Sequence, residues 1–175
     1  MRKPALLSLV LLLSLVAVAQ EKKPPLSPRK SAEHSFADGK KVSIDYGSPS
    51  IRGRKIMGGL VPYGQVWRTG ANEATGFVTD TDLMVGETKV PAGKYTIYTL
   101  PGETSWQLII NKQTGQWGTE YNQSQDLARI PMKLDALNSP VEQMTFSLEE
   151  TGPDSANLVL EWEKTKLTVP LKEAK

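Results

Sequence analysis

The densest group of chemically capable side chains lies between residues 66 and 75, in the sequence VWRTGANEAT. It brings together an indole, a guanidinium, an amide and a carboxylate, from Trp67, Arg68, Asn72 and Glu73. A guanidinium presents a two-pronged fork to a carboxylate, phosphate or sulfate, and an indole offers a flat face to a sugar or aromatic ring. The amide and the carboxylate add donors and acceptors that orient a polar ligand. The stretch therefore indicates a pocket for a small anionic ligand or a glycan.

Other residues could complete this pocket. Arg52 and Arg54 precede the stretch and add two guanidinium forks. A second irregular, polar segment adds the aromatic faces of Trp117 and Tyr121. The candidate ligand-binding set is Arg54, Trp67, Arg68, Asn72, Glu73, Trp117 and Tyr121. We expect its arginines to bind an anionic or hydroxyl-rich group, its tryptophans to stack on the ligand, and its amide and carboxylate to orient it.

Three alternatives to a binding protein stay open. In a structural interpretation, an arginine pairs with Glu73 across the connection while the tryptophans fill the core beneath, so that the polar groups satisfy one another. A hydrolase would use Glu73 as general acid and base, with Asp126 or His34, and requires a water-accessible carboxylate with a raised pKa. A cell-envelope structural or interaction protein would instead use an exposed apolar sheet face. Between a binding protein and an enzyme, we prefer a binding protein.

Metal and cofactor chemistry lack the motifs they require. The chain has no cysteine and one histidine, His34, which excludes thiolate ligands and multi-histidine sites. The sequence GRKIMGG at 53–59 has the glycine spacing of a phosphate-binding loop but lacks the Lys and Ser or Thr that complete that motif. The acidic DTD at 80–82 lacks the spacing of an EF-hand. We therefore expect neither a metal nor a cofactor.

The first residues read as an export signal. Residues 1–19 combine Arg2 and Lys3, an apolar run from 5 to 16 and a terminal AVA, which is the pattern of a signal peptide cleaved after Ala19. Residues 20–30, QEKKPPLSPRK, have the prolines and charges of a flexible tether. A single domain is expected over residues 31–173, in a periplasmic or extracellular protein without a membrane span after cleavage.

The charge balance bears on the expected partners. The chain has 21 Lys and Arg against 19 Asp and Glu, and two of the cations but none of the acids lie in residues 1–19. Removing the signal leaves 19 of each, which gives no electrostatic reason to expect nucleic acid or an anionic membrane as a partner. A small polar ligand or glycan remains the expected partner, and the oligomeric state is left open.

Most of the chain follows the two-residue period of β-strands. In MTFSLEE, Met144, Phe146 and Leu148 alternate with polar residues. About eight strands are expected, over 42–46, 76–80, 82–86, 95–100, 106–111, 144–150, 157–163 and 166–171. We expect a hairpin turn at EKTK, 163–166, and a strand end or sheet edge at Pro170. The pattern predicts an all-β, antiparallel β-sandwich resembling a jelly roll, with two long irregular loops at 47–75 and 112–131.

Three stretches carry a family resemblance. They are SPSIRGRKIMGGLVPYGQVWRTGANEAT at 48–75, VPAGKYTIYTLPGETSWQLIINKQTGQWGTEYN at 90–122 and LEWEKTKLTVPL at 160–171. They resemble the bacterial exported family catalogued as domain of unknown function 2911, from about Ser27 to Leu171. The motifs concerned fall on 53–55, 61–64, 67–72 and 91–95, and on Asn111, Lys112, Trp117 and Gly118. The resemblance implies a bacterial cell-envelope or secreted setting and transfers no catalytic residue.

Overall fold

The computed structural model describes residues 25–174. The expected signal peptide, its cleavage site and residues 20–24 of the expected tether lie outside the described residues. Within residues 25–174, no helix is long and apolar enough to cross a membrane.

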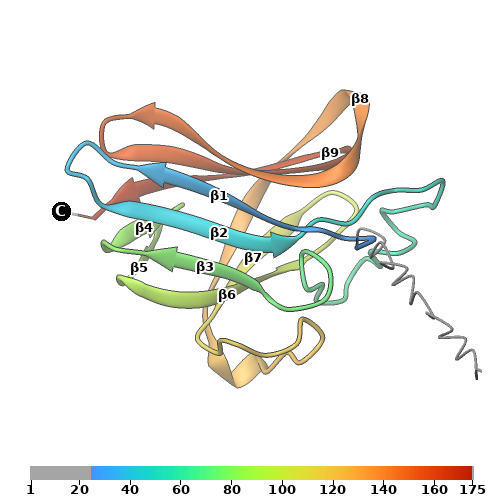
Figure 1. The fold of residues 1–175 in the computed structure, drawn as a ribbon, viewed down its shortest axis with the longest axis horizontal. Helices are drawn as coiled ribbons and strands as arrows, with labels where there is room; N and C mark the ends of the chain where they lie inside the picture. Colours follow the sequence, from blue (N-terminus) through green and yellow to red (C-terminus); the bar gives the residue numbers. More distant parts are fainter. Residues whose placement is uncertain (1–24, 175) are drawn as a thin grey trace, which may run out of the picture.

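Nine antiparallel strands form one sheet (Figure 1). They are β1 (Arg29–Ser35), β2 (Lys41–Gly47), β3 (Thr75–Thr79), β4 (Leu83–Val85), β5 (Thr88–Val90), β6 (Gly93–Leu100), β7 (Trp106–Asn111), β8 (Asp126–Gly152) and β9 (Ser155–Glu173). A single 3-10 turn, η1 (Gln123–Gln125), precedes β8. The strand order is β1-β2-β3-β6-β7-β8-β9-β4-β5. The all-β, antiparallel class predicted from the sequence is confirmed, with all strands belonging to one continuous sheet.

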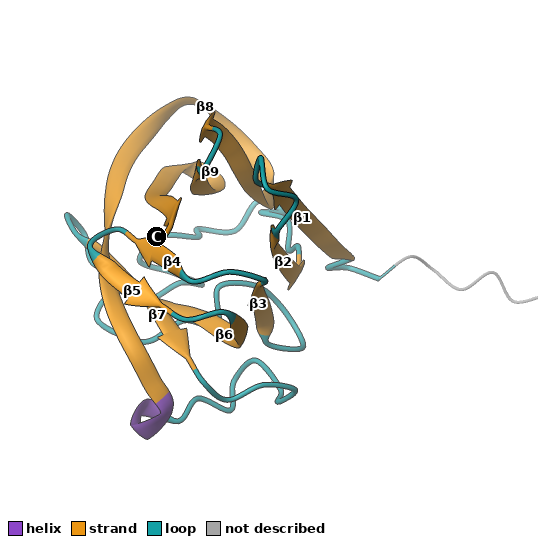
Figure 2. Ribbon diagram, turned by 90° about the vertical axis from the view of Figure 1, so that its left-hand side faces the viewer, coloured by secondary structure: helices purple, strands orange, loops and turns teal. Residues whose placement is uncertain are grey.

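The sheet wraps around one core (Figure 2). Alternation in β2 buries Val42 and Ile44, and near the other end of the strand order β4 buries Leu83 and Val85. All four belong to the same hydrophobic cluster as Trp162 of β9. Side chains at both ends of the strand order therefore pack together, because a twisted sheet of this width lowers its exposed apolar area by curling.

The long strands β8 and β9 correct one prediction. The expected hairpin turn at 163–166 is wrong, since β9 continues through it and pairs with β8 on both sides, as Thr145 with Glu161 and Ala136 with Thr165. Glu163 adopts a φ of 55° there, and the β8–β9 register shifts around Val141. A bulge of this kind absorbs extra residues without ending the ladder. The chain reverses instead between Gly152 and Ser155.

Pro170 lies inside β9, three residues before its end, and β9 is an inner strand between β8 and β4, so neither the expected strand end nor the expected sheet edge falls at this residue. It follows the last residue of β9 that pairs with β8, Thr168, and precedes the first that pairs with β4, Leu171. Its carbonyl still accepts a hydrogen bond from the Gly86 N–H at 2.8 Å. The missing N–H of proline therefore falls where neither neighbouring strand needs it.

The irregular segments also have different bounds from those predicted. The first connection runs between β2 and β3, over residues 48–74. The second covers residues 112–125, because β8 begins at Asp126 and pairs Ala128 and Ile130 with β7. The segment between the strands expected at 82–86 and 95–100 contains the short strand β5. At the N-terminus, β1 begins at Arg29, inside the segment expected to be a tether.

Candidate functional site

The two irregular connections meet in space. Glu73 and Trp117 form an isolated antiparallel bridge between them. The Gly118 N–H donates to the Asn72 carbonyl at 3.0 Å, and the Ala74 N–H donates to the Gln116 carbonyl at 3.2 Å. The connections 48–74 and 112–125 are thus joined by backbone hydrogen bonds, which gives both a fixed position at one end of the sheet.

Thr69 shapes the first connection where it passes the sheet. It is buried, and it adopts a φ of 50°, a left-handed conformation that is rare for a β-branched residue. Its hydroxyl lies 3.0 Å from the Trp67 carbonyl and 3.0 Å from the Thr99 hydroxyl. The Thr75 hydroxyl donates to the Thr69 carbonyl at 2.9 Å. These hydrogen bonds offset the backbone strain at Thr69.

Close backbone contacts at two glycines leave no room for a side chain. A Cβ at Gly47 would lie 2.1 Å from the Ala71 carbonyl oxygen. A Cβ at Gly118 would lie 2.7 Å from the Asn72 carbonyl oxygen and 2.8 Å from Cδ of Arg68. The end of β2 and the second connection therefore hold residues 71–72 from two sides.

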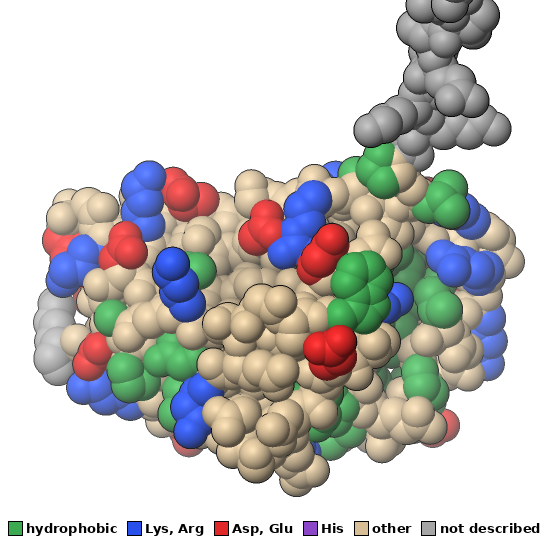
Figure 3. All heavy atoms as spheres, turned by 60° about the horizontal axis from the view of Figure 1, so that its bottom comes forward, with side chains coloured by type: hydrophobic (Ala, Val, Ile, Leu, Met, Phe, Trp, Pro, Cys, Tyr) green, Lys and Arg blue, Asp and Glu red, His purple; other side chains and the backbone are tan. Residues whose placement is uncertain are grey.

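A pocket of about 470 Å³ lies between the connections and the sheet. Of the seven candidate residues, five line it: Arg54, Trp67, Arg68, Asn72 and Tyr121. Glu73 and Trp117 lie outside the lining, although they join the two connections. In Figure 3 the surface is hollowed toward the end where hydrophobic and Lys or Arg side chains gather. The structure therefore brings most of the candidate set to one cavity.

The pocket is positively charged. Arg52, Arg54 and Arg68 line it, and no Asp or Glu is among the described residues of its wall. Arg54 donates to the carbonyls of Ser50 and Ile51, and Arg52 donates to the carbonyl of Leu26. Because a carbonyl oxygen carries no formal charge, these hydrogen bonds leave the positive charges of the two guanidinium groups uncompensated. The Arg68 guanidinium makes no hydrogen bond or ion pair with the described part of the chain, while its stem packs against Gly118.

The two described arginines outside the pocket are paired with carboxylates. Arg29 pairs with Asp45, and its Nη1 lies 3.9 Å from Glu73. Arg129 pairs with Asp126 at 3.0 Å. Arginines of this chain thus have carboxylate partners everywhere in residues 25–174 except in the pocket.

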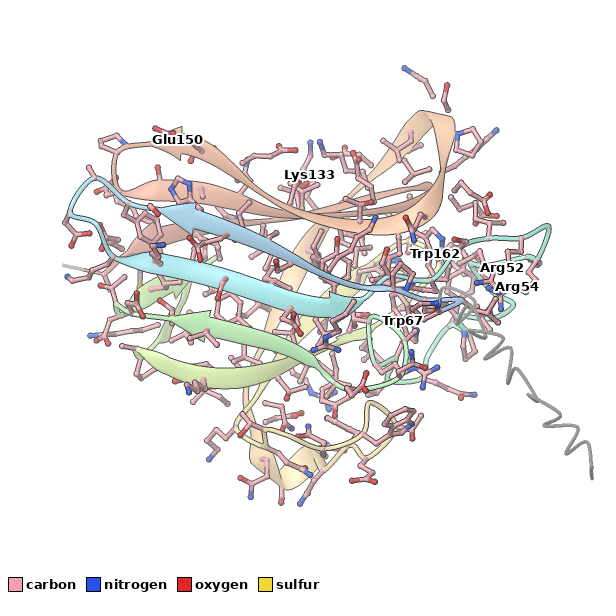
Figure 4. All side chains as sticks on the ribbon, in the orientation of Figure 1. Arg52, Arg54, Trp67, Lys133, Glu150 and Trp162 are labelled. Carbon is pink, nitrogen blue, oxygen red and sulfur yellow. The ribbon has the colours of Figure 1, made fainter. Side chains whose placement is uncertain are left out.

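Trp67 joins the pocket to the core. It stacks on Trp162 with ring centroids 5.8 Å apart and planes 16° apart, and its edge meets Trp106 at 6.4 Å. Its backbone forms a bridge with Thr99, with N–H···O distances of 2.8 and 3.0 Å. Figure 4 shows Trp67 and Trp162 at the same end of the molecule as Arg52 and Arg54. One face of the Trp67 ring is therefore used by the core.

Tyr121 belongs to a hydrogen-bond network behind the pocket wall. Its hydroxyl donates to Asp126 at 2.6 Å and accepts from Arg129 at 2.8 Å. Its ring meets Tyr98 edge to face at 4.9 Å. Burial, followed by the hydrogen bond and charge of Asp126, raises the pKa of Tyr121 to about 12. Tyr121 is thus held as a neutral phenol against a fixed ion pair.

The residues expected of a hydrolase are dispersed or already bonded. Glu73 is exposed, and its carboxylate lies near Arg29 rather than in the pocket. Both oxygens of Asp126 accept hydrogen bonds, from Asn111, Tyr121 and Arg129. His34 lies on β1, in edge contact with Phe36. Among residues 25–174, no group of three or more His, Cys, Asp or Glu is placed to hold a metal ion.

Sequence reasoning missed several residues of the pocket wall. Arg52 is outside the candidate set, but it lies two residues before Arg54 and lines the same cavity. Leu26 and Leu60 line the pocket as exposed apolar side chains. Tyr98 and Trp162 come from β6 and β9, and only tertiary packing brings these strand residues to the cavity. No local signal in the sequence could have placed these two.

A comparison with family profiles matches residues 27–171 to the family described as "Protein of unknown function (DUF2911)". The chain belongs to this family. The DUF2911 match begins next to Leu26 in the pocket wall and ends within β9, so it contains both connections and nearly the whole sheet. The family resemblance seen in the sequence is confirmed. Neither the curated proteins nor the solved structures gave a match.

Proposed function

We propose that this DUF2911 protein is an exported binding protein whose pocket holds a small anionic ligand. One observation carries the proposal: three arginines line a cavity that has no carboxylate among its described lining residues. Desolvating unpaired cations is unfavourable, so a half-buried guanidinium such as that of Arg68 gains most from an anion that enters the pocket. The signal-like residues 1–19 support export.

The chemistry of the wall favours an anion of modest size. Arg68 supplies an uncommitted guanidinium, which binds a carboxylate, phosphate or sulfate with two parallel hydrogen bonds. Asn72 adds an amide, and the accessible part of Trp67 adds an apolar contact for a carbon skeleton. The cavity of about 470 Å³ lies in the size range of small-molecule sites.

A neutral glycan receives less support from the geometry than an anion does. Trp67 gives one face to Trp162, and Trp117 is 46% exposed but lies outside the pocket lining. Fewer free aromatic faces are therefore available for stacking than the sequence suggested. The proposal for a flat apolar sheet face also loses support, since only one exposed large hydrophobic residue of the described chain, Leu127, lies on a strand.

Isothermal titration tests the proposal with inorganic phosphate, sulfate, galacturonate and galactose. Galacturonate and galactose are matched probes, because they differ by the carboxylate. We expect the three anions to bind and galactose to bind at least tenfold more weakly. Replacing Arg68 by Gln removes the charge while keeping part of the stem, and should weaken anion binding by roughly 10- to 100-fold, as for hydrogen bonds between charged groups.

Lys94→Gln is the control for a general change in charge. Lys94 is exposed on β6 and is not part of the pocket lining. We expect this variant to bind the anions as the wild type does. Wild-type protein that binds none of the three anions, or an Arg68→Gln variant that binds them unchanged, would refute the anion site.

A further inference from the structure

Exposed apolar side chains gather around the cationic pocket. The large hydrophobic residues that are exposed in the described chain are Leu26, Leu60, Tyr63, Trp117 and Leu127. Leu26 and Leu60 form part of the pocket wall, and they are 73% and 47% exposed. The Tyr63 ring lies over Gly58, in the same turn as Leu60. Three of the five therefore lie on one side of the pocket mouth.

A rigid turn presents Leu60 to the solvent. The Val61 N–H donates to the Ile56 carbonyl at 2.9 Å, and the Gly58 N–H donates to the Val61 carbonyl at 2.9 Å. Ile56 and Val61 are fully buried and anchor the turn in the core. The Leu60 N–H is also bonded, to the Lys55 carbonyl at 3.1 Å. Leu60 is exposed because the turn is built to project it, not because the segment lacks packing.

Uncompensated cations surround these apolar side chains. Arg52, Arg54 and Lys55 are exposed, and none of their side chains forms an ion pair with a described carboxylate. The nearby Glu142 accepts from the Arg52 backbone N–H at 2.9 Å instead of from its guanidinium. Figure 3 shows Lys or Arg side chains beside hydrophobic ones at the hollowed end of the surface.

We propose that this side of the pocket docks onto an anionic lipid surface. The proposal rests on the proposed function, and it assigns the bound anion to a lipid head group. Leucine and tyrosine side chains insert at the boundary between head groups and acyl chains, while nearby Lys and Arg are attracted to the anionic surface. Leu26, Leu60 and Tyr63 provide the inserting groups, and Arg52, Arg54 and Lys55 provide the charge.

The opposite side of the pocket mouth does not take part. Trp117 is bridged to Glu73, and both Glu73 and Glu120 are exposed near it. Carboxylates would be repelled by an anionic membrane. On the side of the turn 55–63, Glu142 and Glu163 accept from the backbone N–H groups of Arg52 and Met57. The exposed leucines and cations of that side orient the turn toward the lipid, and the bridge between residues 73 and 117 faces away.

Co-sedimentation with vesicles tests the proposal. The purified protein is mixed with vesicles of phosphatidylcholine alone or with vesicles that contain 30% phosphatidylglycerol. We expect binding to the mixed vesicles only, and a decrease as the salt concentration rises. Leu60→Ser should lower the vesicle partition coefficient by about fivefold, because the exposed part of the leucine side chain, 47% of the residue, no longer gains from transfer into the lipid.

Leu127→Ser is the matched control, since Leu127 is 37% exposed on β8 and does not line the pocket. It should bind vesicles as the wild type does, and thermal unfolding confirms that both serine variants fold. Tyr63 is exposed but does not line the pocket, so Tyr63→Ser should weaken vesicle binding and keep the affinity for inorganic phosphate, which separates the two proposals. Wild-type protein that binds phosphate but not the mixed vesicles would overturn lipid docking alone, and so would Leu60→Ser binding vesicles normally. Protein that binds neither phosphate nor vesicles would overturn both proposals.

Discussion

Replacing Gly118 by Ala tests whether contact between the two connections holds the pocket. The backbone at this position has no positive φ, so alanine meets no conformational penalty there. Its Cβ would instead lie 2.7 Å from the Asn72 carbonyl oxygen and 2.8 Å from Cδ of Arg68. The Arg68 stem is able to move, but the Asn72 carbonyl is held by the Gly118 N–H itself at 3.0 Å. The backbone must therefore separate at the junction.

The cost follows from the two contacts. Overpacking in a well-packed region costs about 1–3 kcal/mol, and weakening the hydrogen bond from Gly118 to Asn72 adds about 1 kcal/mol. We expect the free energy of unfolding to fall by about 3 kcal/mol in total. For a domain of this size, that loss lowers Tm by roughly 6–12 °C. Differential scanning calorimetry and urea unfolding measure the two quantities independently.

Gly115→Ala provides the control within the same connection. Gly115 has a φ of 81°, and no atom lies within 4 Å of the position of its Cβ. Alanine there costs only the left-handed backbone conformation, about 1 kcal/mol. A Gly118→Ala variant that is no less stable than Gly115→Ala would show that the connections are not tightly joined, and the description of the pocket wall would be wrong.

Two further predictions concern the aromatic residues of the wall. Trp67→Ala should lower the free energy of unfolding by about 3 kcal/mol, because it removes the ring that stacks on Trp162 and leaves a cavity. Urea unfolding followed by fluorescence measures this loss. A loss below about 1 kcal/mol would contradict the role of Trp67 in the core. Tyr121→Phe should lower the free energy of unfolding by about 1–2 kcal/mol at pH 8, since it removes hydrogen bonds with Asp126 and Arg129. The pKa of Tyr121 is raised to about 12 in the folded protein, from an ordinary value of 10.0. As pH rises above 10, the phenol therefore ionises in the unfolded chain while it stays neutral in the folded protein, and this favours unfolding. The stabilisation by Tyr121 is complete below pH 10 and is lost as pH rises toward 12. The difference in stability between wild type and Tyr121→Phe should therefore shrink between pH 10 and 12, and a constant difference would show that Tyr121 titrates equally in both states.

Much of the fold could be read from local alternation. The buried positions of β2, at Val42 and Ile44, follow directly from a two-residue period. The hairpin expected at 163–166 failed because EKTK has a polar composition that is equally suited to a turn and to a bulged strand. Pairing with β8 decides between them, and that partner is distant in sequence. The strand β5 is too short for a periodic pattern to reveal.

The site was predictable in composition but not in its internal pairing. The sequence shows that arginines, tryptophans and two glutamates, Glu73 and Glu120, share the irregular segments. It does not show that Glu73 lies beside Arg29 while Arg68 has no carboxylate partner among the described residues. Nor does it show which tryptophan packs in the core, since Trp67 and Trp117 have similar surroundings in sequence. Such choices depend on long-range packing, which hydrophobic period and residue type leave undetermined.

The position of β4 in the strand order determines when the protein is able to fold. Residues 83–85 form a hairpin with β5 near the middle of the chain, yet the only other strand within residues 25–174 that pairs with β4 is the end of β9, where Leu83 lies opposite Glu173. A ribosome must therefore release nearly the entire chain before this side of the sheet has a partner, and contacts of such sequence separation form slowly. Until then the growing chain remains short of a complete native core, because Leu83 and Val85 of β4 belong to the same hydrophobic cluster as Leu171 of β9.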